Sequence, residues 1–304
     1  MSLILQIIII NWNTRELLRQ CLQSLLEATA HYNQEIIVVD NGSSDGSPEM
    51  VKTEFPEIHL IALKENLGFA RANNIAFNVL KPSSYVLLLN PDTIPTRKVI
   101  DELILFLDKN PSAGAVGPAL IYPNGRAQAG GGYFPSIITI TNYCLFFSHI
   151  SPLVFKGLFI NHRQLGHLNS VEVDWLAGTC LLVRREIIDQ VKGFNEAYFI
   201  YGEDLEWSER IKKSGWKIFY LPQTRIIHYQ GASLGENSSV WIKSLIKYIK
   251  ERKGVSYSLF FRFMAFIGFT LRMLGTYLGY LSTQNLIFKD QAKKMFIFLK
   301  GTLS

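Results

Sequence analysis

The fold is decided by two stretches near the N-terminus, LILQIIIINWN at residues 3–13 and EIIVVDNGSSDG at residues 35–46. Each contains an unbroken run of aliphatic residues, typical of a strand that is buried on both faces. Between them, residues 14–30 repeat apolar side chains at helical spacing. This strand–helix–strand order predicts the start of an α/β fold built on a parallel sheet.

The same alternation continues to about residue 120. We therefore expect a mostly parallel, Rossmann-like central sheet that helices cover on both faces. Further strands are predicted at residues 58–63, 85–90, 180–183, 217–221 and 225–228. Further helices are predicted at residues 69–80, 97–110 and 203–214. The segment 122–170 is rich in glycine, proline and other loop-forming residues.

Composition excludes several classes of protein. The chain has 304 residues, 48% of them hydrophobic and 18% charged, which is far from a disordered or collagen-like composition. The three cysteines, Cys21, Cys144 and Cys180, are odd in number and widely spaced, so they indicate a reducing compartment and no disulfide framework. The N-terminus lacks the basic region and cleavage site of a signal peptide.

The positive charge is concentrated at the C-terminal end. Residues 241–304 carry eleven Lys and Arg against two carboxylates, a net charge of +9, and since the whole chain carries +6, residues 1–240 carry −3. A nucleic-acid-binding protein more often spreads basic residues over a folded face, so we expect no nucleic-acid partner. Basic residues that flank very apolar sequence instead indicate an anionic membrane surface.

The most apolar stretch is residues 259–281, which also contain Arg262 and Arg272. Eleven Leu, Ile and Phe residues favour insertion by roughly 5 kcal/mol, and two central arginines oppose it by a similar amount. A helix lying in the membrane interface, a spanning helix and a partner-binding helix all stay open, and the glycines and flanking lysines favour the first. We expect a catalytic domain at 1–240 and a helical membrane-association region at 241–304.

Polar residues follow three of the predicted strands. They are Asn11-Trp12-Asn13, Asp40-Asn41 and Asn90-Pro91-Asp92. Because ligands of such sheets bind beyond the carboxyl ends of the strands, these residues can line one crevice. None of these strand ends carries the glycine pattern of a dinucleotide-binding site or a P-loop, so hydride transfer and ATP hydrolysis are not favoured.

Four acidic residues and one histidine each allow two readings. Asp40 fits a nucleotide-binding carboxylate or a turn residue, and Asp92 a ligand for a divalent cation or a Pro-Asp turn. Glu203 and Asp204 fit the favoured acidic start of a helix, or a desolvated general base beside aromatic residues. His228 fits a metal ligand or a structural histidine.

The order of the motifs removes some of this ambiguity. The chain closely resembles glycosyltransferase family 2, and most of all its rhamnosyltransferase-like branch, which builds bacterial surface polysaccharides. The resemblance spans about residues 3–235. It rests on NWN (11–13), VVDNGSSDGS (38–47), NLGFARANN (66–74), LLNPD (88–92), WLAG (175–178), the aromatic stretch 194–201, Glu203-Asp204 and His228.

The resemblance implies a GT-A fold, a nucleotide-diphosphate-sugar donor and inversion at the anomeric carbon. Asp204 matches the family's catalytic base, and Glu203 beside it would orient the acceptor, near Trp175. Asp92 and His228 match positions that hold a divalent metal, Mg or Mn. The donor-binding positions that the resemblance implies are Asn11, Trp12, Asn13, Asp40, Asn41, Arg71 and Asn90.

One position departs from the family pattern. Asn90 stands where the metal motif D-x-D has its first carboxylate, so the metal would have one fewer anionic protein ligand. An amide carbonyl and the phosphates of the donor can still coordinate such an ion. We therefore expect metal dependence with modest affinity.

The expected reaction is transfer of a sugar, with rhamnose as the candidate, from a dTDP- or UDP-linked donor to a glycan or polyprenyl-linked acceptor. The expected location is the cytoplasm, peripherally on the inner face of the cell membrane. Two alternatives stay open: a catalytically inactive GT-A-like module that binds glycan or serves as a scaffold, and a nucleotidyltransferase. The latter would need a basic glycine-rich loop near the N-terminus, which residues 11–15 do not provide.

Overall fold

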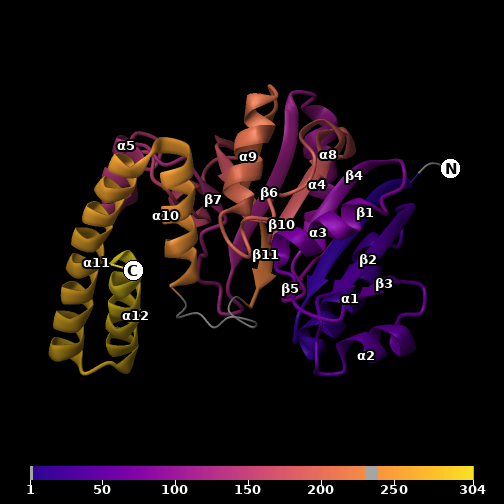
Figure 1. Ribbon diagram of the computed structural model, residues 1–304, viewed down its shortest axis with the longest axis horizontal. Coiled ribbons are helices and arrows are strands. Elements are labelled where there is room, and N and C mark those ends of the chain that lie inside the picture. Colours follow the sequence, from indigo (N-terminus) through magenta and orange to yellow (C-terminus); the bar gives the residue numbers. More distant parts are fainter. Residues whose placement is uncertain (1–2, 230–238, 304) are drawn as a thin grey trace. The chain divides into compact units, whose positions relative to one another are not determined.

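A nine-stranded mixed sheet forms the centre of the first of two units in the computed structural model, which describes residues 3–229 and 239–303 (Figure 1). This unit, called the sheet unit here, comprises Met1–Gly132, Ile160–Phe199 and Glu203–Ser233. The second, called the helical unit, comprises Tyr133–Phe159, Ile200–Gly202 and Leu234–Ser304.

The sheet has the strand order β3-β2-β1-β4-β10-β6-β11-β5, with β8 paired to β11. Its strands are β1 (Leu3–Asn11), β2 (Gln34–Asp40), β3 (His59–Ala62), β4 (Ser83–Leu89), β5 (Thr93–Ile94), β6 (Ala113–Ile121), β8 (Val171–Val173), β10 (Cys180–Arg184) and β11 (Lys217–His228). A small second sheet pairs β7 (Gly131–Gly132) with β9 (Trp175–Leu176).

The helices of the sheet unit connect and cover these strands. They are α1 (Arg15–Thr29), α2 (Ser47–Glu54), α3 (Phe69–Phe77), α4 (Arg97–Lys109), α7 (His162–Leu165), α8 (Arg185–Val191) and α9 (Glu203–Lys213). The helical unit contains α5 (Ile137–Cys144), α6 (Phe147–Ile150), α10 (Val240–Lys253), α11 (Val255–Thr283) and α12 (Leu286–Leu303). Helix α2 and strand β6 were not predicted from the sequence.

The N-terminal half of the sheet is parallel, as predicted. Strands β3, β2, β1 and β4 all run the same way, and their register places Asn11 opposite Asp40 and Ile9 opposite Leu89. The polar residues that follow β1, β2 and β4 therefore meet at one edge of the sheet. This arrangement confirms the α/β fold class.

The other half of the sheet is mixed. Strand β10 enters at the carboxyl edge of β4, where Cys180 pairs with Leu89, and therefore runs antiparallel to both β4 and β6. Strands β6 and β11 are parallel to each other. The two strands predicted at 217–221 and 225–228 are one strand, β11, and that part of the prediction was wrong. Its register shifts between Leu221 and Arg225, where Pro222 lacks the N–H that a regular ladder needs.

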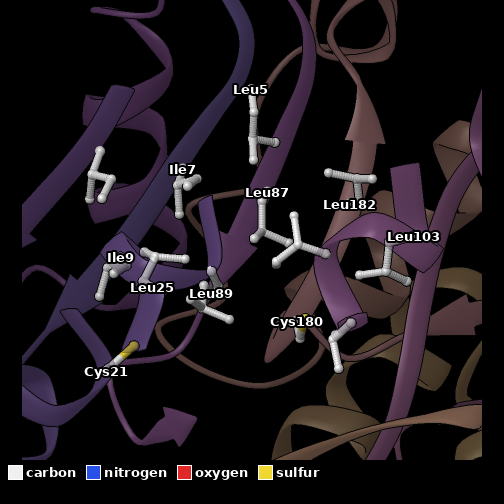
Figure 2. Close-up of a cluster of buried hydrophobic side chains, with 14 of the residues drawn as sticks. Leu5, Ile7, Ile9, Cys21, Leu25, Leu87, Leu89, Leu103, Cys180 and Leu182 are labelled. Atoms are coloured by element: carbon white, nitrogen blue, oxygen red, sulfur yellow. The ribbon is translucent and has the colours of Figure 1, made fainter. Parts of the chain in front are cut away.

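The core lies on both faces of the parallel strands. Leu5, Ile7 and Ile9 of β1 belong to the buried cluster on one face of the sheet, where Leu25 of α1 lies beside Ile9 and Leu103 of α4 lies beside Leu182 of β10 (Figure 2). The intervening residue Ile8 is also buried, on the face toward α3. All three cysteines are buried thiols, and burial raises the pKa of Cys21 to about 12. Burial of both faces over Leu5–Ile9 explains why β1 shows no regular polar alternation.

In the helical unit, α11 packs against α10, α12 and α5 (Figure 1). We expected the C-terminal region to start at residue 241, and this unit also takes in Tyr133–Phe159 and Ile200–Gly202. Among the described residues, one helix, α11, is long and apolar enough to cross a membrane by length and composition. Arg262 of α11 donates to the Thr302 carbonyl, and Arg272 donates to the Tyr143 carbonyl and lies over the Phe146 ring.

Candidate active site

The buried carboxylate of Asp40 lies at the carboxyl ends of β1 and β2. Its side chain is 1% exposed, and Asn11 Nδ2 donates to its Oδ2 at 2.8 Å. The backbone N–H of Ser43 donates to its Oδ1 at 2.9 Å, and Thr14 Oγ1 fixes the Asn11 amide from the other side at 2.6 Å. A carboxylate accepts about four hydrogen bonds, so this well-oriented group retains capacity for a ligand.

The turn after Asp40 is fastened to the end of β1. Asn13, exposed and in the left-handed region at φ 52°, donates its N–H to Ser43 Oγ and accepts from the Ser44 N–H. Asparagine tolerates this backbone conformation better than most residues do. Trp12 beside it is half-buried. Ser43, which sequence reasoning did not single out, contacts Asn11, Asn13 and Asp40 and is the centre of this corner.

Asn41 faces the protein. It is 3% exposed, its Nδ2 donates to Asn66 Oδ1 at 2.9 Å, and its Oδ1 accepts from the Leu67 N–H at 2.8 Å. These bonds hold the turn that leads into α3. Arg71 on the first turns of α3 is exposed, with its Nε 3.8 Å from Glu196 Oε2. In the structure, Asn41 thus supports the loop before α3, and the Arg71 side chain is accessible to solvent.

Asp92 and His228 lie together, as their assignment to one metal site requires. Strand β5 pairs with the end of β11, opposing Thr93 and His228, and Tyr229 donates its N–H to the Asp92 carbonyl at 2.9 Å. Asp92 Oδ1 and His228 Nε2 are 3.3 Å apart, and both side chains are at most 10% exposed. The pairing of two strands far apart in sequence creates this contact.

Gln128, which the sequence did not reveal, fixes the imidazole of His228. Its Nε2 donates to the His228 carbonyl at 2.7 Å, which orients the amide, and its Oε1 lies 2.7 Å from His228 Nδ1. Nδ1 must therefore carry a proton, which leaves Nε2, the ring nitrogen that faces Asp92, as the one that can bind a metal.

This donor set fits a divalent metal. A carboxylate oxygen and an imidazole nitrogen are both accepted ligands of Mn²⁺, and oxygen ligands suit Mg²⁺. Within residues 3–229 and 239–303, no group of three or more His, Cys, Asp or Glu gathers to hold an ion. Asp92 and His228 would thus supply two protein ligands to such an ion. Asn90 next to it is half-buried, and its carbonyl accepts from Thr93 Oγ1.

Glu203 and Asp204 begin α9 and differ sharply in environment. Glu203 is 4% exposed, and among the described residues nothing hydrogen-bonds to its Oε2. Burial, with a further contribution from the charge of Asp204, raises the pKa of the Glu203 carboxyl well above its usual range. Asp204 is partly exposed, and its Oδ1 accepts the Leu205 N–H at 2.8 Å. The pair therefore consists of a buried carboxylic acid next to an accessible carboxylate.

Helix α3 anchors the loop that leads to these carboxyls. Asn74 donates to the Phe194 carbonyl at 2.9 Å and accepts the Phe194 N–H at 2.7 Å. The Phe69 N–H donates to the Phe199 carbonyl, and a Cβ on Gly68 would lie 2.5 Å from that same oxygen. A glycine is therefore required at 68. After Ser43 and Gln128, Asn74 is a third residue that the sequence did not single out.

Trp175 is buried, 6% exposed, on β9. Strand β9 contacts α9, the helix that Glu203 and Asp204 begin, and Trp175 pairs with Gly132 of β7. A Cβ on Gly131 would lie 2.5 Å from the Trp175 carbonyl, so the close pairing of β7 with β9 requires a glycine at this position of the run 130–132. Trp175 therefore lies on an element next to the acidic helix.

Comparison with known proteins agrees with this geometry. The family model described as "Glycosyl transferase family 2" matches residues 6–192. The N-acetylglucosaminyl-diphospho-decaprenol L-rhamnosyltransferase of Mycobacterium tuberculosis is 30% identical over 249 residues, covering 78% of this chain and 80% of that protein. Rhamnosyltransferase WbbL of Escherichia coli is 26% identical, covering 82% of this chain and 94% of that protein.

The fold is similar to that of solved glycosyltransferases. The mannosyltransferase PcManGT of Pyrobaculum calidifontis, solved with GDP-Man and Mn²⁺, aligns with a TM-score of 0.61 at 14% identity, covering 100% of this chain and 87% of that one. At this identity the likeness concerns the fold alone, and it confirms the predicted GT-A architecture. Since the family model matches more than half of the sequence, the chain belongs to glycosyl transferase family 2 and is rhamnosyltransferase-like within it.

Proposed function

We propose that this chain is an inverting, metal-assisted glycosyltransferase that moves a sugar, with rhamnose as the candidate, from a dTDP- or UDP-linked donor to a lipid-linked glycan. The observation that carries the proposal is that the sheet unit has three separate carboxyl groups, each in a different environment. Asp40 lies at the carboxyl edge of the sheet, Asp92 faces His228, and Asp204 is accessible beside the buried Glu203.

The nucleotide of the donor is assigned to the corner formed by Asp40 and the end of β1. The remaining acceptor capacity of the Asp40 carboxylate suits N–H or O–H groups of a base or ribose. Trp12, half-buried beside it, can stack on the base. Asn11, Asn13 and Asn41 act through the loops that they fasten. Arg71 is exposed and can reach a phosphate.

Asp92 and His228 would hold the divalent metal, with Asn90 adjacent. When bound, such an ion neutralises charge that develops on the departing diphosphate. With two protein ligands the site depends on donor phosphates for the rest of its coordination. We therefore expect metal and nucleotide diphosphate to bind cooperatively.

Asp204 is assigned as the general base. Its partly exposed carboxylate accepts the proton of the acceptor hydroxyl while that oxygen attacks C1 of the donor sugar from the side opposite the diphosphate. Glu203, kept protonated by burial, can donate a hydrogen bond to the acceptor from its Oε2 group. One base and one displacement give inversion. Trp175, on the strand next to α9, is assigned to the acceptor side.

The helical unit is assigned to the inner membrane surface. Leu259, Phe263, Phe266, Leu274, Tyr277 and Leu281 of α11 are exposed at spacings that place them on one face of the helix. Arg262 and Arg272, the charges that oppose insertion, bond within the unit instead. A lipid-linked acceptor would place the substrate at the same surface. The relative in Mycobacterium tuberculosis carries a diphospho-decaprenol acceptor in its name.

Calorimetry tests the donor assignment directly. We expect the purified chain to bind dTDP or UDP, more tightly with Mn²⁺ or Mg²⁺ than with a chelator. Asp204→Asn should lower the transfer rate by about 10²–10⁴-fold and leave nucleotide binding within a factor of about two. Failure to bind any nucleotide would favour an inactive GT-A-like module. An unchanged rate in the variant would remove Asp204 as the base.

A further inference from the structure

A basic hollow lies in the helical unit and is lined by none of the residues assigned above to donor, metal or base. It has a volume of about 560 Å³ and is lined by Lys243, Ile246, Lys247, Lys250, Glu251 and Arg262. The three lysines follow one another at i, i+4 and i+7 and so share one face of α10. Arg262 comes from α11, which packs against α10. We call this the basic groove.

The groove has a strong excess of positive charge. Four cationic side chains face one carboxylate, Glu251, whose Oε1 is 4.0 Å from Lys247 Nζ. Like charges at i and i+4 on one helix face destabilise it unless an anion compensates. Arg262 is fixed in orientation by its bond to the Thr302 carbonyl at 2.8 Å. A guanidinium has five N–H donors, so this bond leaves others for anionic oxygens.

The surface next to the groove is apolar. On α11, Phe263 follows Arg262 directly and is 63% exposed, and Leu259, three residues before Arg262, is 60% exposed. A free phosphate would use the cations and leave this apolar face unused. A phosphate that carries a long hydrocarbon chain would use both.

We propose that the basic groove binds the diphosphate headgroup of a polyprenyl diphosphate-linked acceptor, with the prenyl chain along the exposed face of α11. This inference rests on the proposed function, because it identifies where the acceptor lipid is held. A diphosphate diester carries two negative charges, which fits the excess of three positive charges in the groove. Anionic phospholipid is the competing occupant, and the experiment separates the two.

Vesicle flotation of the full-length protein tests the groove. One set of phosphatidylcholine vesicles contains a prenyl diphosphate, and the other contains phosphatidylglycerol to the same total charge. We expect wild type to prefer the prenyl diphosphate vesicles. The variant Lys243→Gln/Lys247→Gln/Lys250→Gln should lose that preference, with binding to those vesicles weakened about tenfold or more.

The matched control is Lys289→Gln/Lys293→Gln/Lys294→Gln, which removes the same charge from α12 outside the groove. It should keep the wild-type preference. Equal weakening by both triple variants, or equal binding of wild type to both vesicles, would overturn the proposal and leave general attraction to an anionic surface.

The outcome is independent of catalysis. Asp204→Asn should bind the prenyl diphosphate vesicles as wild type does. If no nucleotide binds in calorimetry but the preference for prenyl diphosphate persists and depends on the three lysines, the proposed function fails and the groove stands. If nucleotides bind but the preference is absent, the transferase stands and the groove fails.

Discussion

Glu203 and Asp204 are neighbours in sequence, yet Glu203 is buried with a raised pKa and Asp204 is partly exposed. Burial without a partner for Oε2 favours the neutral acid at Glu203, and the charge of Asp204 strengthens this effect. A pair of carboxyls whose pKa values are pushed apart can supply one hydrogen-bond donor and one base at the same pH. The alternative reading, in which both residues only favour the helix start, does not explain a buried acid at the first position.

This difference predicts a stability effect that depends on pH. The folded-state pKa of Glu203 is raised, so between the unfolded-state value and the raised value the folded chain binds more protons than the unfolded chain. The free energy of unfolding therefore falls as pH rises through that window. Glu203→Gln should remove this loss, so its melting temperature should exceed that of wild type by more at about pH 8 than at about pH 5. Each kcal/mol of unfolding free energy corresponds to about 2–4 °C in melting temperature.

The control for this prediction is Glu57→Gln, since Glu57 is exposed. Its melting temperature should follow that of wild type at both pH values. A difference between Glu203→Gln and wild type that stays constant across the pH range would show that Glu203 is not held protonated in the folded state.

Gln128 leads to a prediction about metal binding. Gln128→Leu removes the acceptor that keeps the proton on His228 Nδ1, so the Nε2 lone pair is no longer fixed toward Asp92. Loss of such a supporting contact typically weakens metal binding 10–100-fold. Titration of free Mn²⁺ by electron paramagnetic resonance, with nucleoside diphosphate present, measures the change.

Gln6→Leu is the matched control, because Gln6 is also a fully buried amide but lies on β1 and donates to Glu35. It should lower thermal stability without changing Mn²⁺ affinity. If both variants bind Mn²⁺ as wild type does, Gln128 has only a structural role.

At the scale of elements, α3 links the two halves of the proposed site. Arg71 lies on its first turns. One turn later, Asn74 holds the loop before α9 by hydrogen bonds to the backbone carbonyl and the backbone N–H of Phe194. Asn74→Ala should therefore displace Asp204 more than it disturbs the nucleotide. We expect kcat to fall about 10–100-fold, since small displacements of a base are costly, while nucleotide affinity changes by about twofold or less.

Steady-state kinetics and calorimetry measure the two quantities. Asn78→Ala, at the exposed end of the same helix, is the control and should change neither. If Asn74→Ala lost nucleotide affinity as well as kcat, α3 itself would have moved. The result would then give no evidence that the loop before α9 positions Asp204.

The elements that could be predicted were those with a local signal. The apolar runs of β1, β2 and β4 and the polar residues that follow them predicted the parallel strands and the edge at which their polar ends meet. The direction of β10 depends on where the chain returns after residues 122–179, a segment of loops, short helices and short strands, and no local pattern encodes that return. Gln128 and His228 are 100 positions apart and meet through tertiary packing, so their contact had no sequence signal.

At the scale of the whole molecule, charge and apolar surface are divided between the units. The net charge of +9 lies on residues 241–304. Most of the exposed large hydrophobic residues of the described chain lie in the helical unit, either in that region or in the segment Tyr133–Phe159, which includes Ile138, Ile150 and Val154. The sequence alone left open a spanning, interfacial or partner-binding tail, because the arginines of 259–281 counted fully against insertion. In the structure both arginines bond to groups of their own unit, which leaves one uncharged face of α11 outward.

That face predicts binding to membranes that is insensitive to salt. Phe263, Leu274 and Leu281 are each at least 50% exposed on it, and burying such a side chain contributes about 1.5–3 kcal/mol. Phe263→Ser/Leu274→Ser/Leu281→Ser should therefore weaken flotation on neutral phosphatidylcholine vesicles at high ionic strength by about 100-fold or more. Ile4→Ser/Val79→Ser/Leu105→Ser, which changes exposed apolar residues of the sheet unit, should bind as wild type does.

Alkaline carbonate extraction then separates the two membrane-bound arrangements. An interfacial helix is released, because only one of its faces contacts the lipid, whereas a spanning helix stays in the bilayer. We expect release of wild type, since α11 also buries Phe261, Met264 and Phe269 against its own unit and cannot expose its whole circumference to lipid. Retention after extraction would require α11 to leave those contacts. Failure of wild type to float on any vesicle would make the exposed face of α11 a site for a protein partner.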